Sequence, residues 1–131
     1  MDISEALGRL IPFATHLGIQ LKEQGGGRTL LTLELRPELM NSFHSAHGGV
    51  VMTLLDIAMA RAACTLDDRA VGAITVEMKT SFIGVCRGTL TAVGQCLHLG
   101  TSVAFCEGEL RDSEGKLVAK ASGTFMVRRE R

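Results

Sequence analysis

Apolar residues dominate one long stretch of the chain, HGGVVMTLLDIAMARAA, from His47 to Ala63. From Gly49 to about Thr65 there is no proline, and Met, Leu and Ala are the commonest residues, so the pattern predicts a helix. The apolar positions go nearly all the way round this helix, whereas a surface helix carries them on one face. We therefore expect a helix that a sheet wraps or that packs at an interface.

The chain before this helix predicts a hairpin and a loop. Two strand-like stretches, residues 16–23 and 28–35, flank a triple-glycine turn that tolerates positive φ. Residues 3–10 predict a short N-terminal helix, which Pro12 ends. Residues 36–49 have mixed polarity with one proline and two glycines, which predicts a loop long enough to carry function.

The chain after the helix predicts four strands. These stretches are rich in Val, Thr and Phe, partly alternate in polarity and are joined by short turns, so we expect an antiparallel meander. With the hairpin they give an α+β fold, in which an antiparallel sheet of five or six strands accompanies one long central helix. The four stretches are residues 73–82, 89–99, 102–112 and 117–127.

Length and composition limit the possible roles. The 131 residues predict one domain, residues 1–131, with the 46% hydrophobic and 21% charged residues of an ordinary globular protein. The 14 basic and 14 acidic side chains cancel, so no net field attracts nucleic acid or an anionic membrane. The acidic N-terminus is unlike a signal peptide, no apolar run is long enough to span a bilayer, and the four cysteines form no C-x-x-C pair. These features predict a cytoplasmic protein with no nucleic-acid or membrane partner.

One carboxylate, Asp56, interrupts the apolar helix. Together with Gly49, Thr53 and Ala60 it follows spacings of four, three and four, which places a small polar stripe on one helix face. Burying a charged carboxylate without partners is unfavourable, so Asp56 has a partner, lies at a solvated cleft or is protonated. The purely structural alternative is an ion pair with a basic residue. The basic candidates are Arg61 and Lys79.

The start of the helix, at His47-Gly48-Gly49, offers a second chemical group. The first N–H groups of a helix are unpaired and carry partial positive charge, and glycine has no Cβ to keep a ligand away. Gly48 and Gly49 are therefore candidates for binding a carbonyl group and stabilising the oxyanion formed from it. Asp56 lies eight residues after Gly48, about 12 Å along the helix axis. Both groups serve one reaction only if Asp56 meets the helix start of a second subunit, so we expect a dimer with antiparallel helices.

The sequence N-S-F-H-S-A-H-G-G-V-V-M-T-L-L-D resembles the signature of hotdog-fold acyl-CoA thioesterases of the phenylacetate-degradation (PaaI) type. That signature has an Asn, then a His-Gly-Gly beginning six residues later, then an Asp eight residues past the first Gly. The matching residues here are Asn41, His47, Gly48, Gly49 and Asp56. The likeness extends to I-P-F-A-T-H-L-G-I, A-I-T-V-E-M-K-T-S-F and G-K-L-V-A-K-A-S-G-T-F, and so covers nearly the whole chain. It implies a hotdog fold, in which a sheet wraps a long helix.

The resemblance also implies a role for each site residue. The Gly48 N–H polarises the thioester carbonyl, and Asn41 and His47 shape the loop and help to hold substrate or water. Asp56 of a partner subunit acts on water as a general base or attacks the carbonyl as a nucleophile. Thr75 matches a position where the family often has Ser or Thr to aid the water. The expected catalytic residues are Asp56, Gly48, Asn41, His47 and Thr75, with Gly49 in substrate binding.

The implied enzyme hydrolyses acyl-CoA thioesters and needs no cofactor or metal, because coenzyme A arrives as part of the substrate. Family members commonly form dimers of dimers, so we expect a homotetramer with active sites at a subunit interface. The sequence suits aromatic and medium-chain acyl groups equally. Two alternatives stay open: a hotdog enoyl-CoA hydratase or dehydratase, and a non-catalytic acyl-CoA-binding module. His44 and His47 have a spacing that metal ligands use on a helix, but they lie in a loop without a cysteine or acid at a standard spacing.

Overall fold

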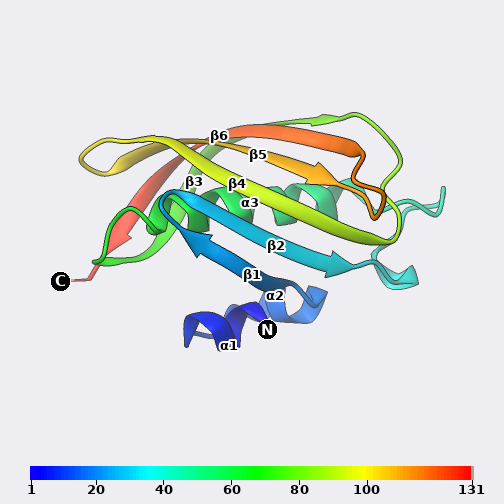
Figure 1. Cartoon of the computed structure of the whole chain (residues 1–131), viewed down its shortest axis with the longest axis horizontal. Coiled ribbons are helices and arrows are strands. Elements are labelled where there is room, and N and C mark those ends of the chain that lie inside the picture. The colour runs from blue at the N-terminus through cyan, green and yellow to red at the C-terminus, as the bar shows by residue number, and fades with distance from the viewer. Residues whose placement is uncertain (131) are drawn as a thin grey trace.

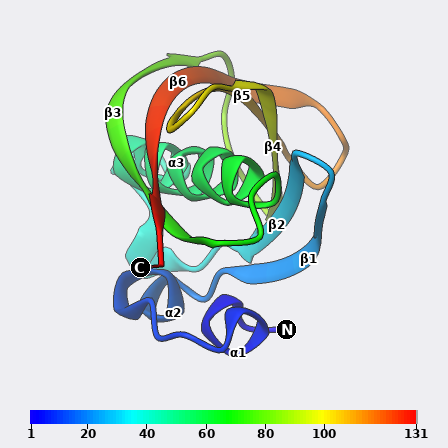
Figure 2. The same ribbon diagram turned by 90° about the vertical axis from the view of Figure 1, so that its left-hand side faces the viewer.

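The predicted long helix is α3, Gly48–Cys64, and it lies under a curved sheet of six strands (Figure 1). The computed structural model describes residues 1–130, and Arg131, the last residue of the predicted domain, lies outside them. In Figure 2 the sheet arches over α3, while the short helices α1 (Ile3–Leu7) and α2 (Pro12–Leu17) lie below it. The predicted α+β fold is confirmed, since an antiparallel sheet wraps one long helix.

The sheet covers one face of α3 and leaves the opposite face open. Buried positions recur as adjacent pairs every four residues, which places them on one wide face. The positions between these pairs, among them Met52, Asp56 and Arg61, are exposed or half-buried. The sheet therefore covers one side of α3, and within one chain the opposite side of the helix is uncovered. The paired buried residues are Val50, Val51, Leu54, Leu55, Ala58, Met59, Ala62 and Ala63.

The order of the strands in the sheet differs from the predicted meander. The order is β1-β2-β4-β5-β6-β3, where β1 is Gln20–Gly25 and β2 is Arg28–Glu34, and every pair of neighbours is antiparallel. Strands β4, β5 and β6 do form a meander, but β3 pairs with β6 and lies at the sheet edge. The prediction of a four-stranded meander was wrong because alternating polarity defines the two faces of a strand and says nothing about its neighbours. These strands are β3 (Ala70–Phe82), β4 (Thr89–Leu99), β5 (Val103–Arg111) and β6 (Leu117–Arg129).

The N-terminal part differs from its prediction at two places. Strand β1 (Gln20–Gly25) begins later than predicted, because residues 16–17 belong to α2. Pro12 does not end the first helix but starts the second, where its missing N–H leaves no hydrogen bond unmade. Helix α1 ends instead at Gly8, whose φ of 63° is left-handed. The hairpin is confirmed, with β2 (Arg28–Glu34) antiparallel to β1.

Two glycines opposite each other in the sheet let α3 approach it closely. Gly94 of β4 pairs with Gly108 of β5. A Cβ added to Gly94 would lie 2.2 Å from the carbonyl oxygen of Ala58 and 2.7 Å from the backbone nitrogen of Met59. Both atoms belong to the backbone of α3, so the helix would have to move away from the sheet.

We therefore expect Gly94→Ala to lower the free energy of unfolding by about 3 kcal/mol, because relieving this clash disturbs the packing of the helix on the sheet. Urea denaturation followed by circular dichroism measures the change. Gly72→Ala is the matched control, since a Cβ there meets no atom within 4 Å. Equal stability of the two variants would contradict the close approach of α3 to β4.

Strand β3 has an outer edge that no strand of the described chain pairs with, and apolar side chains along it are exposed. Ile74 and Val76 are 49% and 58% exposed. Phe82, at the end of β3, and Ile83 and Val85, which follow it, are also exposed. Apolar edge strands of this kind are typical of surfaces that another chain covers.

Candidate functional site

The loop before α3 is held in shape by Asn41. Its side-chain oxygen accepts hydrogen bonds from the backbone N–H groups of Phe43 at 2.8 Å and Ser45 at 3.2 Å. The backbone N–H of Asn41 donates to the Ser45 carbonyl oxygen at 2.8 Å. Both side-chain bonds use the oxygen, so the NH₂ group of Asn41 is available to a ligand. These bonds hold the loop in shape, and the part of Asn41 in substrate binding stays a prediction.

His47 immediately precedes α3, and its side chain caps the helix. The ring Nδ1 accepts a hydrogen bond from the Gly49 N–H at 2.9 Å. The N–H groups of Val50 and Val51 donate to the His47 carbonyl oxygen. The Gly48 N–H has no acceptor within residues 1–130. The cap thus occupies the Gly49 donor and leaves Gly48 as the free donor at the positive end of the helix.

Gly48 lines a cavity of about 290 Å³, which we call the Gly48 pocket. The position of a Cβ on Gly48 is 3.4 Å from the ring of Phe82, so the backbone itself forms part of the wall. A donor that is partly shielded from water interacts more strongly with a negative oxygen than the same donor in bulk water. The lining residues are Asn41, Ser45, Ala46, Gly48, Val51, Phe82, Gly84 and Cys86.

A buried serine, absent from the predicted site, ties this loop to the sheet. The Ser45 Oγ accepts a hydrogen bond from the Cys86 N–H at 2.9 Å, and the Ala46 N–H donates to the Cys86 carbonyl at 2.9 Å. These bonds hold the Asn41 loop against the segment that follows β3. The only sequence signal for this role was a small hydroxyl residue inside the motif.

Asp56 lies on the open face of α3, half-buried, and is held by a residue of β3. The Thr75 hydroxyl donates a hydrogen bond of 2.5 Å to Asp56 Oδ1. No salt bridge within residues 1–130 includes Asp56, so the alternative pairing with Arg61 or Lys79 is not observed. The structure therefore places Thr75 beside Asp56 and leaves the second carboxylate oxygen free of protein partners within the described residues; the role of Thr75 toward the water stays a prediction.

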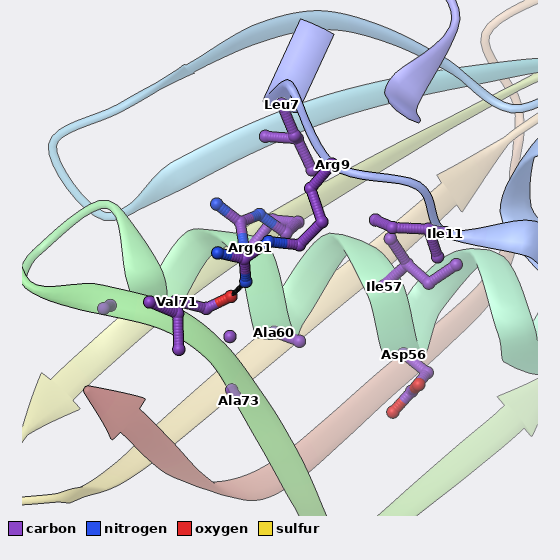
Figure 3. A pocket seen from close by; sticks show the side chains of 11 residues that line it. Leu7, Arg9, Ile11, Asp56, Ile57, Ala60, Arg61, Val71 and Ala73 are labelled. Atoms are coloured by element: carbon purple, nitrogen blue, oxygen red, sulfur yellow. Dashed lines mark hydrogen bonds between the residues drawn. The ribbon is translucent and has the colours of Figure 1, made fainter. Parts of the chain in front are cut away.

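Asp56 stands at one end of a second cavity, the Asp56 pocket, of about 340 Å³ (Figure 3). This cavity lies between α3, the start of β3 and the segment that joins α1 to α2. Its walls are mostly apolar, apart from Asp56 and two arginines at the other end. The lining residues are Leu7, Arg9, Ile11, Asp56, Ile57, Ala60, Arg61, Ala70, Val71, Gly72 and Ala73.

One chain brings the predicted residues together in two groups rather than one. Asn41, His47 and Gly48 gather at the start of α3, whereas Asp56 and Thr75 lie about 12 Å further along the helix axis. The Gly48 pocket and the Asp56 pocket have no lining residue in common. Each group therefore contributes half of the chemistry expected of the site.

Burial raises the pKa of three cysteine thiols, Cys64, Cys86 and Cys106, above the ordinary value. A raised pKa keeps a thiol protonated and makes it a poor nucleophile. These cysteines therefore act as small apolar residues of the interior. Cys86 lines the Gly48 pocket in this role.

In the part of the chain that the structure describes, no group of three or more His, Cys, Asp or Glu side chains lies close enough together to hold a metal ion. Across residues 1–130, no helix is both long enough and apolar enough to pass through a bilayer. The predicted lack of a cofactor stays a prediction.

Comparison with known proteins gives consistent matches in sequence and fold. Residues 43–119 match the family model described as the thioesterase superfamily. The acyl-coenzyme A thioesterase PaaI of Escherichia coli is 30% identical over 112 residues, which cover 84% of this chain and 78% of that protein. The solved structure of a conserved protein of Pseudomonas aeruginosa has a TM-score of 0.84 and 28% identity, covering 91% of this chain and 95% of that chain. The structure of the Escherichia coli PaaI protein, from the phenylacetic acid degradation operon, also has a TM-score of 0.84, with 24% identity and coverage of 95% and 90%, and so shares the fold.

Proposed function

Because the chain belongs to the thioesterase superfamily, we propose that it hydrolyses acyl-CoA thioesters to a free carboxylic acid and coenzyme A. It is a thioester hydrolase of the hotdog fold, and a relative with 30% identity is named an acyl-coenzyme A thioesterase. The observation that carries the proposal is the pair of reactive groups on α3: the N–H of Gly48, which has no acceptor within residues 1–130 and belongs to a residue that lines a pocket, and an Asp56 carboxylate held by Thr75. Thioester hydrolysis needs such a pair, a donor for the developing oxyanion and a base or nucleophile.

The complete site is proposed to form between two chains. Within one chain Gly48 and Asp56 are too far apart to contact the same carbonyl group, being about 12 Å apart along the axis. If a second α3 runs antiparallel across the open helix face, Asp56 of one chain approaches the partner subunit's Gly48, and the reverse holds at the second site. The uncovered edge of β3, with Ile74 and Val76 exposed, supports a contact between chains at this side of the sheet. Two such dimers would give the expected homotetramer.

In the general-base route, Asp56 takes a proton from water while the water oxygen attacks the carbonyl carbon of the thioester. The carbonyl oxygen becomes an oxyanion and accepts a hydrogen bond from the partner subunit's Gly48. The intermediate then collapses: the C–S bond breaks, and the departing sulfur takes the proton from Asp56. In the nucleophilic route the carboxylate attacks the carbon itself, the C–S bond breaks and coenzyme A leaves as its thiolate, which gives an anhydride. Water then hydrolyses this anhydride to the free acid and restores the Asp56 carboxylate. In both routes the Thr75 hydroxyl, at 2.5 Å from Oδ1, orients the carboxylate and leaves its second oxygen to react.

A panel of aromatic and medium-chain acyl-CoAs, scored by release of free thiol, tests the proposed function. Turnover of at least one of them at a saturable rate is the expected result. Binding of several acyl-CoAs without release of thiol would favour the non-catalytic acyl-CoA-binding module. Addition of water to an enoyl-CoA, without cleavage of its thioester, would favour the hydratase.

A further inference from the structure

Arg61 stands in the Asp56 pocket without a partner. It lies on the open face of α3, five residues after Asp56, and is half-buried. Its Nε is buried and has no hydrogen-bond partner, and no salt bridge within the described chain includes this arginine. A guanidinium removed from water loses hydration that is regained only when an anion or an acceptor binds it.

Arg9 reaches the same end of the pocket from another element. It follows α1, and its guanidinium donates a hydrogen bond to the carbonyl oxygen of Val71 at the start of β3. Figure 3 shows the Arg9 and Arg61 side chains at one end of the cavity and Asp56 at the other. Asp67, which follows α3, does not neutralise them, because it is paired with Arg129. This end of the pocket therefore carries two positive charges, while the walls between it and Asp56 are apolar.

We propose that the Asp56 pocket holds the acyl group of the substrate, and that Arg61 and Arg9 select acyl-CoAs whose acyl group ends in a carboxylate. This inference rests on the proposed function, since it takes Asp56 as the group that meets the thioester carbon. Arginine is the side chain best suited to such a terminus, because its planar fork donates two parallel hydrogen bonds to one carboxylate.

The length of the pocket supports this assignment. Arg61 is the fifth residue after Asp56, which places it about 7.5 Å further along the helix axis. A short dicarboxylic acyl chain, or an aromatic ring bearing a carboxylate, spans such a distance between its thioester carbon and its distal end. The phosphates of coenzyme A are a second possible source of anionic charge, but the long pantetheine arm separates them from the thioester. The apolar walls from Ile57 to Ala60 suit the methylene groups or ring of an acyl chain and offer nothing to a phosphate.

The test compares adipoyl-CoA with hexanoyl-CoA, which have the same number of acyl carbons and differ by a terminal carboxylate. For the unmodified protein, kcat/KM for adipoyl-CoA should exceed that for hexanoyl-CoA by about ten- to a hundredfold, the effect of a charged hydrogen bond. In Arg61→Met the ratio should fall to about one, and Arg61→Lys should keep part of the preference. Arg9→Met, on an exposed segment, should also lower the ratio, and it replaces Arg61→Met as the test if that variant does not fold. Arg28→Met, at the exposed start of β2, is the matched control and should keep the full ratio.

The same comparison with N-acetylcysteamine thioesters, which carry no phosphate, shows whether the arginines bind the carboxylate of the acyl chain or the phosphates of coenzyme A. If the arginines bind the acyl terminus, the preference for the adipoyl group and its loss in Arg61→Met persist with these substrates. If Arg61→Met weakens both CoA substrates equally and changes neither N-acetylcysteamine thioester, Arg61 binds phosphate and the inference is wrong. Hydrolysis of hexanoyl-CoA as fast as adipoyl-CoA by the unmodified protein overturns the inference and leaves the proposed function standing. Failure to cleave any thioester overturns both.

Discussion

Replacing Asp56 by Asn is expected to lower kcat for the best acyl-CoA by about a hundred- to ten-thousandfold, because the amide neither takes a proton from water nor attacks a carbonyl. Asn has the shape of Asp, and its side-chain oxygen still accepts the hydrogen bond from Thr75. The open face of α3 should therefore keep its structure and its contacts. Release of free thiol at saturating substrate measures the effect.

The control for this variant is Asp68→Asn, which removes a carboxylate from an exposed position just beyond α3. Both variants should show the same circular dichroism spectrum and the same oligomeric state as the parent protein. Only Asp56→Asn should lose turnover. Hydrolysis at the parental rate by Asp56→Asn would mean that another group activates the water.

Gly48→Pro is expected to lower kcat by about a hundred- to a thousandfold, the effect of removing one oxyanion donor. Proline has no N–H, so this substitution deletes the proposed donor without removing a side chain. The first position of a helix tolerates proline, and His47 already has the extended ψ of 140° that a following proline requires. The backbone at position 48 should therefore tolerate proline, whereas most other positions of the helix would not.

Gly48→Ala is the matched variant, because it adds a Cβ at the same place and keeps the N–H. Its Cβ would lie 3.4 Å from the Phe82 ring, so some loss of activity from crowding is expected. The ratio of kcat between the alanine and proline variants then reports the contribution of the N–H alone. Equal activity of the two variants would remove the Gly48 N–H from the mechanism.

The fold could be predicted where its signals are local. The apolar run from Gly49 onward identified α3 within one residue at each end, because helix length and composition are read from consecutive residues. The position of β3 beside β6 could not be predicted, since strand pairing joins segments far apart in the chain. The stripe of Gly49, Thr53, Asp56 and Ala60 lies on the face that the sheet leaves open, because the residues that the sheet buries are all apolar.

The candidate site was predictable for a similar reason. Asn41, His47 and Gly48 lie within one short motif, so the spacing that defines them also places them in one loop and helix start. Thr75 was identified through the family resemblance, and its hydrogen bond to Asp56 forms because β3, far along the chain, packs beside α3. Arg9 and Arg61 meet only in the folded chain, 52 residues apart, and no sequence pattern connects them.

The central claim is that each active site takes Asp56 from one chain and the Gly48 N–H from another, and mixing two inactive variants tests it most directly. Asp56→Asn and Gly48→Pro chains are combined in equal amounts, subunits are allowed to exchange, and thiol release is measured. Half of the dimers are then mixed, and each mixed dimer holds one site with both groups intact, so activity should return to about one quarter of the parental value. If the site lies within one chain, every chain in the mixture carries a defect, and activity stays at the level of the separate variants.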